Sequence, residues 1–221
     1  GRGPPPPAPR PAGGSPAGPG GRCAAAGPGP RSGAMTTADS AAAFSAFHDG
    51  WSSGRPQVVV RRLVDDLETP VSAFLKVGRG RAHAFLLESV EGGAVNGRYS
   101  IITREPDVVW RCRDRKPELA RGETAIAAGQ YAPDGEDPLA SLRSLMAASR
   151  FELPDDLPPM AAGLFGVFGY DMVRLLEPLG EPNPDPLNLP DAVMTRPAIV
   201  GIFDSVKHEI VLVSAAYPDS G

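Results

Sequence analysis

The apolar residues of this chain come in short runs rich in β-branched side chains, joined by short connections. Runs of this kind are typical of β-strands, and consecutive strands with short connections pair antiparallel. The pattern predicts the α+β class: a mainly antiparallel β-sheet with a few packing helices. The runs are "PQVVVRRLVDDL", "HAFLLESVEGG", "GRYSIITREPDVVWRCR" and "RPAIVGIFDSVKHEIVLVSAA".

The third run contains Pro106, which we expect to separate two apolar segments. In the second segment, alternation puts Val108, Trp110 and Cys112 on one face, and Val109, Arg111 and Arg113 on the other. A period of two residues with one apolar face indicates a half-buried strand. In the last run, two strands meet around residues 204–208, and the second is apolar on both faces, so we expect it to lie between other layers.

Two helices are indicated by their capping residues. "TPVSAFLKV" starts with Thr69 as N-cap and Pro70 at the first helical position, and the helix should end at Gly78. "EDPLASLRSLMAASR" has Asp137 as cap and Pro138 in its first turn. Its apolar side, which we expect to pack, holds Leu139, Leu142, Leu145 and Met146. Before the first strand, "SAAAFSAFHDGWSSGR" is expected to be a short helix or an irregular lead-in.

Glycines recur inside one further apolar segment, "MAAGLFGVFGYDMVRLLEPL". They stand at positions 163, 166 and 169. Glycine inside a strand usually marks a bulge or the close approach of another backbone. We therefore expect such a feature here.

Residues 1–34 differ from the rest, because 31 of these 34 positions are Gly, Pro, Ala or Arg. This composition offers almost no side chain for a core, so we expect disorder, and Met35 opens a normal composition. The predicted organisation is a disordered leader at 1–34, which we interpret as a mis-assigned translation start, a lead-in at 35–54 and a domain at 55–221. A genuine disordered tail or a targeting segment remain alternatives.

Charge and cysteine content limit the partners and the cellular compartment that we expect for this chain. Without the four leader arginines, 18 basic residues stand against 26 acidic ones, so the folding portion is acidic and a nucleic-acid partner is disfavoured. Cys23 and Cys112 are interpreted as free thiols in a reducing, cytoplasmic compartment. No run approaches the about 20 apolar residues of a membrane span.

A catalytic constellation is not evident from the residues alone. His48, His83 and His208 fall in different elements, and no phosphate loop, dinucleotide fingerprint or nucleophile elbow is present. Asp171, Arg174 and Glu177 are spaced three apart. That spacing fits a structural ion-pair network on a helical turn, with an acid–base role or a supporting role beside another domain's site as alternatives.

The stretch "HAFLLESVEGG" raises a sharper question, because its apolar run ends in Glu88 and Ser89. One interpretation is that the strand simply reaches the surface there. The other is that a carboxylate and a hydroxyl at the end of an apolar wall bind an amino acid through its charged groups. Both interpretations stay open on the residues alone.

Three segments together resemble the N-terminal region of anthranilate synthase component I, a chorismate-utilising enzyme. The resemblance runs from about Arg55 to Pro218. It rests on "TPVSAFLKV", "FLLESVEGGAVNGRYSIITREPDVVW" and "AAGLFGVFGYDMVRLLEPLGEPNPDPLNLPDAVMTRPAIVGIFDSVKHEIVLVSAAYP".

The resemblance implies an enzyme that makes anthranilate from chorismate in tryptophan biosynthesis. Ammonia would come from a glutamine amidotransferase subunit (component II), and Mg²⁺ and chorismate would bind in a C-terminal domain beyond this chain. The chain would then be inactive alone. An aminodeoxychorismate synthase component I fragment, or a non-catalytic amino-acid-binding or docking module, are alternatives.

The resemblance also implies a regulatory role, because in this family the N-terminal region holds much of the feedback site for L-tryptophan. The "LLES" element belongs to that site. Ser89 would contact the amino-acid group of tryptophan, with Glu88 and Leu87 shaping the site and Arg98 in "NGRYS" as a further contact.

Overall fold

The computed structural model describes residues 37–91, 95–150, 153–180 and 184–218. All of them belong to the unit Met35–Gly221. The predicted disordered leader, residues 1–34, lies outside the described residues. The lead-in holds helix α1, Thr37–Ser52, so the helical alternative was the right one.

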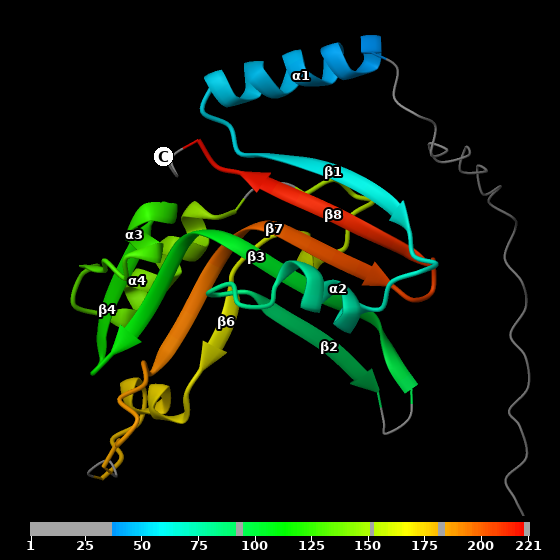
Figure 1. Ribbon diagram of the computed structural model, residues 1–221. Helices are drawn as coiled ribbons and strands as arrows, with labels where there is room; N and C mark the ends of the chain where they lie inside the picture. The colour runs from blue at the N-terminus through cyan, green and yellow to red at the C-terminus, as the bar shows by residue number, and fades with distance from the viewer. Residues whose placement is uncertain (1–36, 92–94, 151–152, 181–183, 219–221) are drawn as a thin grey trace, which may run out of the picture. The chain divides into compact units, whose positions relative to one another are not determined.

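The described strands form one eight-stranded sheet in which every pair is antiparallel (Figure 1). The order is β1-β8-β7-β3-β4-β5, with β2 on β3 and β6 on β7. The strands are β1 Gln57–Val64, β2 Phe85–Glu91, β3 Val95–Arg113, β4 Lys116–Arg121, β5 Ala132–Pro133, β6 Phe165–Phe168, β7 Ala192–Asp204 and β8 Glu209–Ala216. The predicted fold class is therefore confirmed.

The two long strands β3 and β7 form the spine of the sheet, and each changes its second neighbour along its length. The first half of β3 pairs with β2 and the second half with β4, while β7 pairs first with β6 and then with β8. The sequence predicted that Pro106 separates two segments, and this was wrong, because β3 runs from Val95 to Arg113 without a break. Its strand continues through a bulge, where Pro106 lies opposite Pro197 and the register then shifts. Proline donates no ladder hydrogen bond, so it is tolerated at such an irregularity.

The segment after Pro106 is more deeply buried than a half-buried strand. Val108, Trp110 and Cys112 form a core cluster with Leu142 and Leu145 of helix α4, Pro138–Ala148. Val109 on the opposite face is also fully buried, so the prediction of a half-buried strand was wrong there. The strand runs through the middle of the sheet, where β4 and β7 flank it on both sides.

The capping predictions are confirmed for both helices. Thr69 accepts a hydrogen bond from the Ser72 backbone and caps helix α2, Pro70–Val77, which ends at Gly78. Asp137 accepts from the backbone of Leu139 and caps α4. Met146 is an exception, because it is 46% exposed on the predicted packing side of α4.

Three further predictions concern β6, β8 and membrane insertion. A Cβ at Gly166 would lie 1.9 Å from the Val193 carbonyl oxygen, so this glycine allows the close approach of β6 and β7. Strand β8 buries side chains on both faces, as predicted: Ile210 packs in the cluster beside α2, and Val211 in the cluster on the opposite face. Among the described helices, none has the length and apolar character to cross a bilayer.

Candidate functional site

The candidate site forms where β2 and β3 pair irregularly. We expected β2 to end at Glu88 and Ser89. The strand instead continues to Glu91. Glu88 lies opposite Ser100, whereas Val90 lies opposite Asn96, so three residues of β3 (97–99) face Ser89 alone. Extra residues in one strand form a bulge, which disrupts the ladder and changes the direction of the side chains around it.

Gly97 makes room for Ser89 at this bulge. A Cβ at position 97 would lie 1.7 Å from the Ser89 Oγ and 2.6 Å from the Ser89 Cβ. The hydroxyl of Ser89 donates a hydrogen bond to the Tyr99 carbonyl oxygen at 3.2 Å. Glycine is therefore required here because a neighbouring side chain occupies the space of its Cβ.

A cavity of about 200 Å³ lies beside this bulge, near the N-terminus of α2 and the turn between β7 and β8. Its polar side chains are two carboxylates, three hydroxyls and one guanidinium. The lining residues are Asp65, Pro70, Glu88, Ser89, Gly97, Arg98, Ser100, Phe203 and Ser205.

The structure brings three of the four predicted site residues together in this cavity. Glu88, Ser89 and Arg98 line it, but Leu87 is not among the lining residues. Successive side chains of a strand point to opposite faces, and Leu87 pairs with Ile101 on the face away from Glu88. The role of Leu87 in a ligand site stays a prediction.

Arg98 forms an ion pair with Asp204, the last residue of β7 before the β7–β8 turn. Its Nε and Nη2 donate to the two carboxylate oxygens of Asp204 at 3.0 and 2.7 Å. These hydrogen bonds hold the pKa of the buried Asp204 carboxyl below its usual range and raise the pKa of Arg98. Ser205 donates to the Arg98 carbonyl oxygen through both its backbone and its hydroxyl. The guanidinium therefore already has a carboxylate partner.

Asp65 is the main cavity residue that sequence reasoning missed. It follows the last residue of β1, and its backbone N–H donates to the His208 carbonyl oxygen at 2.9 Å. Within the part of the chain that the structure describes, its Oδ1 is shielded from solvent and has no hydrogen-bond partner. The sequence carried no signal for this placement, because "VDDL" reads as the end of a strand and the cavity depends on long-range pairing.

The other candidate groups do not form a reactive cluster. Arg174 pairs with Asp171 at 2.5 Å, and its Nη1 donates to the Gly180 carbonyl oxygen, which fits the structural interpretation of this segment. Among the described residues, no group of three or more His, Cys, Asp or Glu side chains is placed to hold a metal ion. The Mg²⁺ that the family resemblance implies would bind in a domain beyond this chain, and its binding stays a prediction.

A larger hollow of about 390 Å³ lies beside α4 and β6, but its lining differs in kind. It is lined mainly by apolar side chains, among them Leu142, Met146, Phe168 and Met194. Convergent polar groups that would orient a charged ligand are instead found in the cavity beside Ser89.

Comparison with known proteins finds relatives of this chain that carry one shared name. The chain is 48% identical to anthranilate synthase component 1 of Cereibacter sphaeroides over 178 residues, 80% of this chain and 35% of the relative. It is 36% identical to those of Mycolicibacterium smegmatis and Synechocystis sp., over 72% and 78% of this chain and 29% and 33% of those relatives. No family model matches.

The chain belongs to the anthranilate synthase component 1 family. It spans about a third of the length of these relatives. A solved structure of anthranilate synthase component I from Streptococcus pneumoniae is similar with a TM-score of 0.46 and 20% identity, covering 73% of this chain and 33% of that chain.

Proposed function

We propose that this chain is the N-terminal, regulatory region of an anthranilate synthase component I. The enzyme would convert chorismate and ammonia to anthranilate in the cytoplasm, with ammonia supplied by a glutamine amidotransferase subunit. The observation that carries the proposal is the 48% identity over 178 residues with the Cereibacter sphaeroides relative of that name.

The cavity supports a regulatory role for this region. A free amino acid carries one ammonium and one carboxylate, so its site needs acceptors and donors close together. Glu88 offers carboxylate oxygens, Ser89 offers a hydroxyl that both donates and accepts, and Arg98 offers a guanidinium at one wall. We propose L-tryptophan as the ligand and Ser89 as its main contact from β2.

Binding in this cavity would act on catalysis at a distance. A ligand shifts an equilibrium between two arrangements only by the difference between its affinities for them. The bulge, the turn after β7 and the loop before α2 meet around the cavity, so a ligand there would bias how these three segments are arranged. Weaker tryptophan binding would therefore mean weaker inhibition.

A chimeric enzyme tests the proposal. The matched segment of this chain would replace the corresponding segment of the Cereibacter sphaeroides relative, and the chimera would be assayed with chorismate and ammonia. We expect anthranilate to form and L-tryptophan to inhibit its formation. Anthranilate formation that tryptophan does not affect would contradict the proposal.

The isolated chain provides the complementary test. We propose that it converts no chorismate, because the groups that bind chorismate and Mg²⁺ would lie outside it. The purified chain with chorismate, Mg²⁺ and either ammonia or glutamine should give no anthranilate fluorescence. A signal that scales with the concentration of this chain would contradict the assignment.

A further inference from the structure

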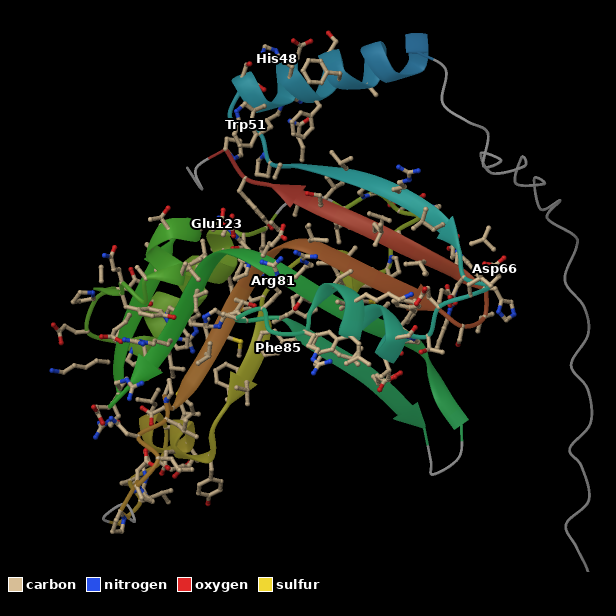
Figure 2. All side chains as sticks on the ribbon, in the orientation of Figure 1. His48, Trp51, Asp66, Arg81, Phe85 and Glu123 are labelled. Carbon is tan, nitrogen blue, oxygen red and sulfur yellow. The ribbon has the colours of Figure 1, made fainter. Side chains whose placement is uncertain are left out.

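Four of the described strands lie at an edge of the sheet, and they differ in charge and length. Each of β1, β2, β5 and β6 has one neighbour among the described strands. In Figure 2 the labelled Asp66 lies just beyond the end of β1, and the labelled Phe85 begins β2. Strand β1 carries Arg61 and Arg62, β2 carries two glutamates, and β5 has only two residues. Charged side chains and short length are features that keep an edge strand from pairing with another chain.

Strand β6 has an exposed edge without a charge. Among the described strands it pairs only with β7 (Figure 1). Its residues carry no charged side chain, and the charge-free stretch around it covers residues 157–170. Val167 is 58% exposed and Phe168 is 51% exposed, although both are apolar. The edge of β6 therefore has the character of a surface to which another strand adds.

The backbone of β6 offers hydrogen-bonding groups at that edge. In an antiparallel ladder, the N–H and C=O of every second residue point toward the neighbouring strand. The Gly169 N–H donates to the Asp191 carbonyl oxygen at 2.7 Å, at the end of the β6–β7 ladder. By this alternation the backbone groups of Val167 point toward β7, whereas those of Gly166 and Phe168 point away from it. An added strand would therefore bond to Gly166 and Phe168.

These two positions are complementary to a second copy of the same strand. If two β6 strands pair antiparallel about a twofold axis at Val167, Gly166 of each copy lies opposite Phe168 of the other. Each such pair can exchange two backbone hydrogen bonds. Side chains directly opposite each other share one face of the sheet. Because Gly166 has no side chain, it leaves room for the Phe168 ring of the second copy.

The apolar hollow beside α4 and β6 lies on this same face. It measures about 390 Å³, and Phe168, Leu142, Met146 and Met194 are among its lining residues. Met194 is the partner of Gly166 in the β6–β7 register. A ring placed over Gly166 would therefore lie beside the hollow. Pockets for side chains next to a paired edge add specificity to the backbone hydrogen bonds.

We propose that two copies of this chain pair through the edges of β6, antiparallel and centred on Val167. The Phe168 ring of each copy occupies the hollow of the other. The contact is isologous, so it closes at two copies. The paired segment is short, and small interfaces give weak association, so we expect a dissociation constant of roughly 1–100 µM.

Sedimentation velocity of the purified 221-residue chain at increasing concentration tests the proposal. The parent chain should change from monomer to dimer across the micromolar range. Val167→Lys places like charges opposite each other, so it should raise the dissociation constant about tenfold or more. Phe168→Ala should also weaken the dimer. The matched control is Val59→Lys, because Val59 is 54% exposed on the edge strand β1, and this variant should dimerise like the parent chain.

A charge exchange tests the register. Val167→Lys and Val167→Glu should each be monomeric, whereas an equimolar mixture should form a heterodimer, because the introduced ammonium and carboxylate then lie opposite each other. A mixture that stays monomeric would overturn the pairing centred on Val167.

Amide hydrogen exchange of the parent chain tests the same contact without a substitution. The amides of Gly166 and Phe168 should exchange more slowly at high than at low protein concentration, whereas the Val167 amide, which points toward β7, should not change. A parent chain that stays monomeric, or a dimer that Val59→Lys disrupts as strongly as Val167→Lys, would overturn the proposal. Protection of Gly166 and Phe168 in the chimeric enzyme alone would mean that the rest of that enzyme occupies the edge, which would also overturn it.

Discussion

Strand β3 carries two bulges, and the polar groups around them differ in one respect. At the bulge near Asp107, Arg196 is fully buried and each of its three side-chain nitrogens has a partner: Nε and Nη2 donate to Asp107 at 2.9 and 2.7 Å, and Nη1 donates to the Ser149 Oγ at 3.5 Å. Its guanidinium also lies 3.9 Å from the centre of the Tyr217 ring. At the bulge near Ser89, a cavity of about 200 Å³ remains, and polar side chains line it.

This difference supports the proposal that the bulge near Asp107 is structural and that the bulge near Ser89 binds a ligand. A closed cluster with satisfied charges leaves nothing for a ligand to bind, and breaking it leaves a buried charge. An open cavity lined by polar side chains leaves room for a ligand and for its hydrogen bonds. The following predictions compare the two bulges, from the largest expected effect to the smallest.

Arg196→Met should cause the largest loss of stability. It keeps much of the side-chain volume but leaves Asp107 without its cation, and breaking a buried pair costs about 3–5 kcal/mol. Urea unfolding followed by circular dichroism measures this. The control is Arg62→Met, whose side chain is 32% exposed against 1% for Arg196 and whose partner Asp156 is 71% exposed, and which should lose about 1 kcal/mol or less. Equal losses in the two variants would remove the distinction between the closed cluster and ordinary surface pairs.

Ser89→Ala should act on ligand binding and not on stability. Loss of a hydrogen bond to a charged group of tryptophan should cost about 1.5–3 kcal/mol of binding, whereas an exposed side chain changes unfolding by about 0.5 kcal/mol or less. In the chimeric enzyme, the tryptophan concentration for half-inhibition should rise about 10- to 150-fold with turnover nearly unchanged. Normal inhibition with lost turnover would make Ser89 structural.

Gly97→Ala should damage stability and ligand binding together. The new Cβ would collide with the Ser89 side chain, and such overpacking costs about 1–3 kcal/mol. Adding Ser89→Gly removes the two nearest colliding atoms and leaves only the carbonyl oxygen of residue 89 at 2.9 Å, so the double variant should regain part of the lost stability while tryptophan binding stays weak. A double variant that is less stable than Gly97→Ala would show that the close approach is not the cause.

The Arg98–Asp204 pair should give a small stability effect that depends on pH. The folded pKa of Asp204 is lowered, so its contribution is present above the unfolded pKa of about 3.9 and is lost as the pH falls through the folded value. Asp204→Asn should therefore be destabilised at pH 7, and the gap to the parent chain should narrow below about pH 4. Urea midpoints at pH 7, 4 and 3 measure it. A gap that stays constant would mean that the charge of Asp204 does not stabilise the fold.

The sequence predicted the individual helices and strands better than it predicted which strands lie side by side. Capping by Thr69 and Asp137 depends on neighbours within three residues, so it could be predicted from local pattern. The continuity of β3 through Pro106 depends on β7 running alongside it, where Pro197 faces Pro106, and no local signal contains that information.

The same reason explains what was found and missed at the candidate site. Glu88 and Ser89 were singled out from the residues and again by the family resemblance, whereas Arg98 came from the resemblance alone, and the structure places all three around one cavity. Leu87 is adjacent in sequence but lies on the other face of β2. Asp65 comes from a different strand, and it reaches the cavity only because β1 pairs with β8 beside the β7–β8 turn.

The central claim is that a ligand completes the open bulge and leaves the closed one unaffected. The most direct measurement is a ¹H–¹⁵N NMR titration of the chain with L-tryptophan. We expect amide shifts to concentrate at the cavity residues Asp65, Glu88, Ser89, Arg98 and Ser205, with Asp107, Ser149 and Arg196 unchanged. Shifts that concentrate at the Arg196 cluster, or no shifts at the cavity at millimolar tryptophan, would contradict the account.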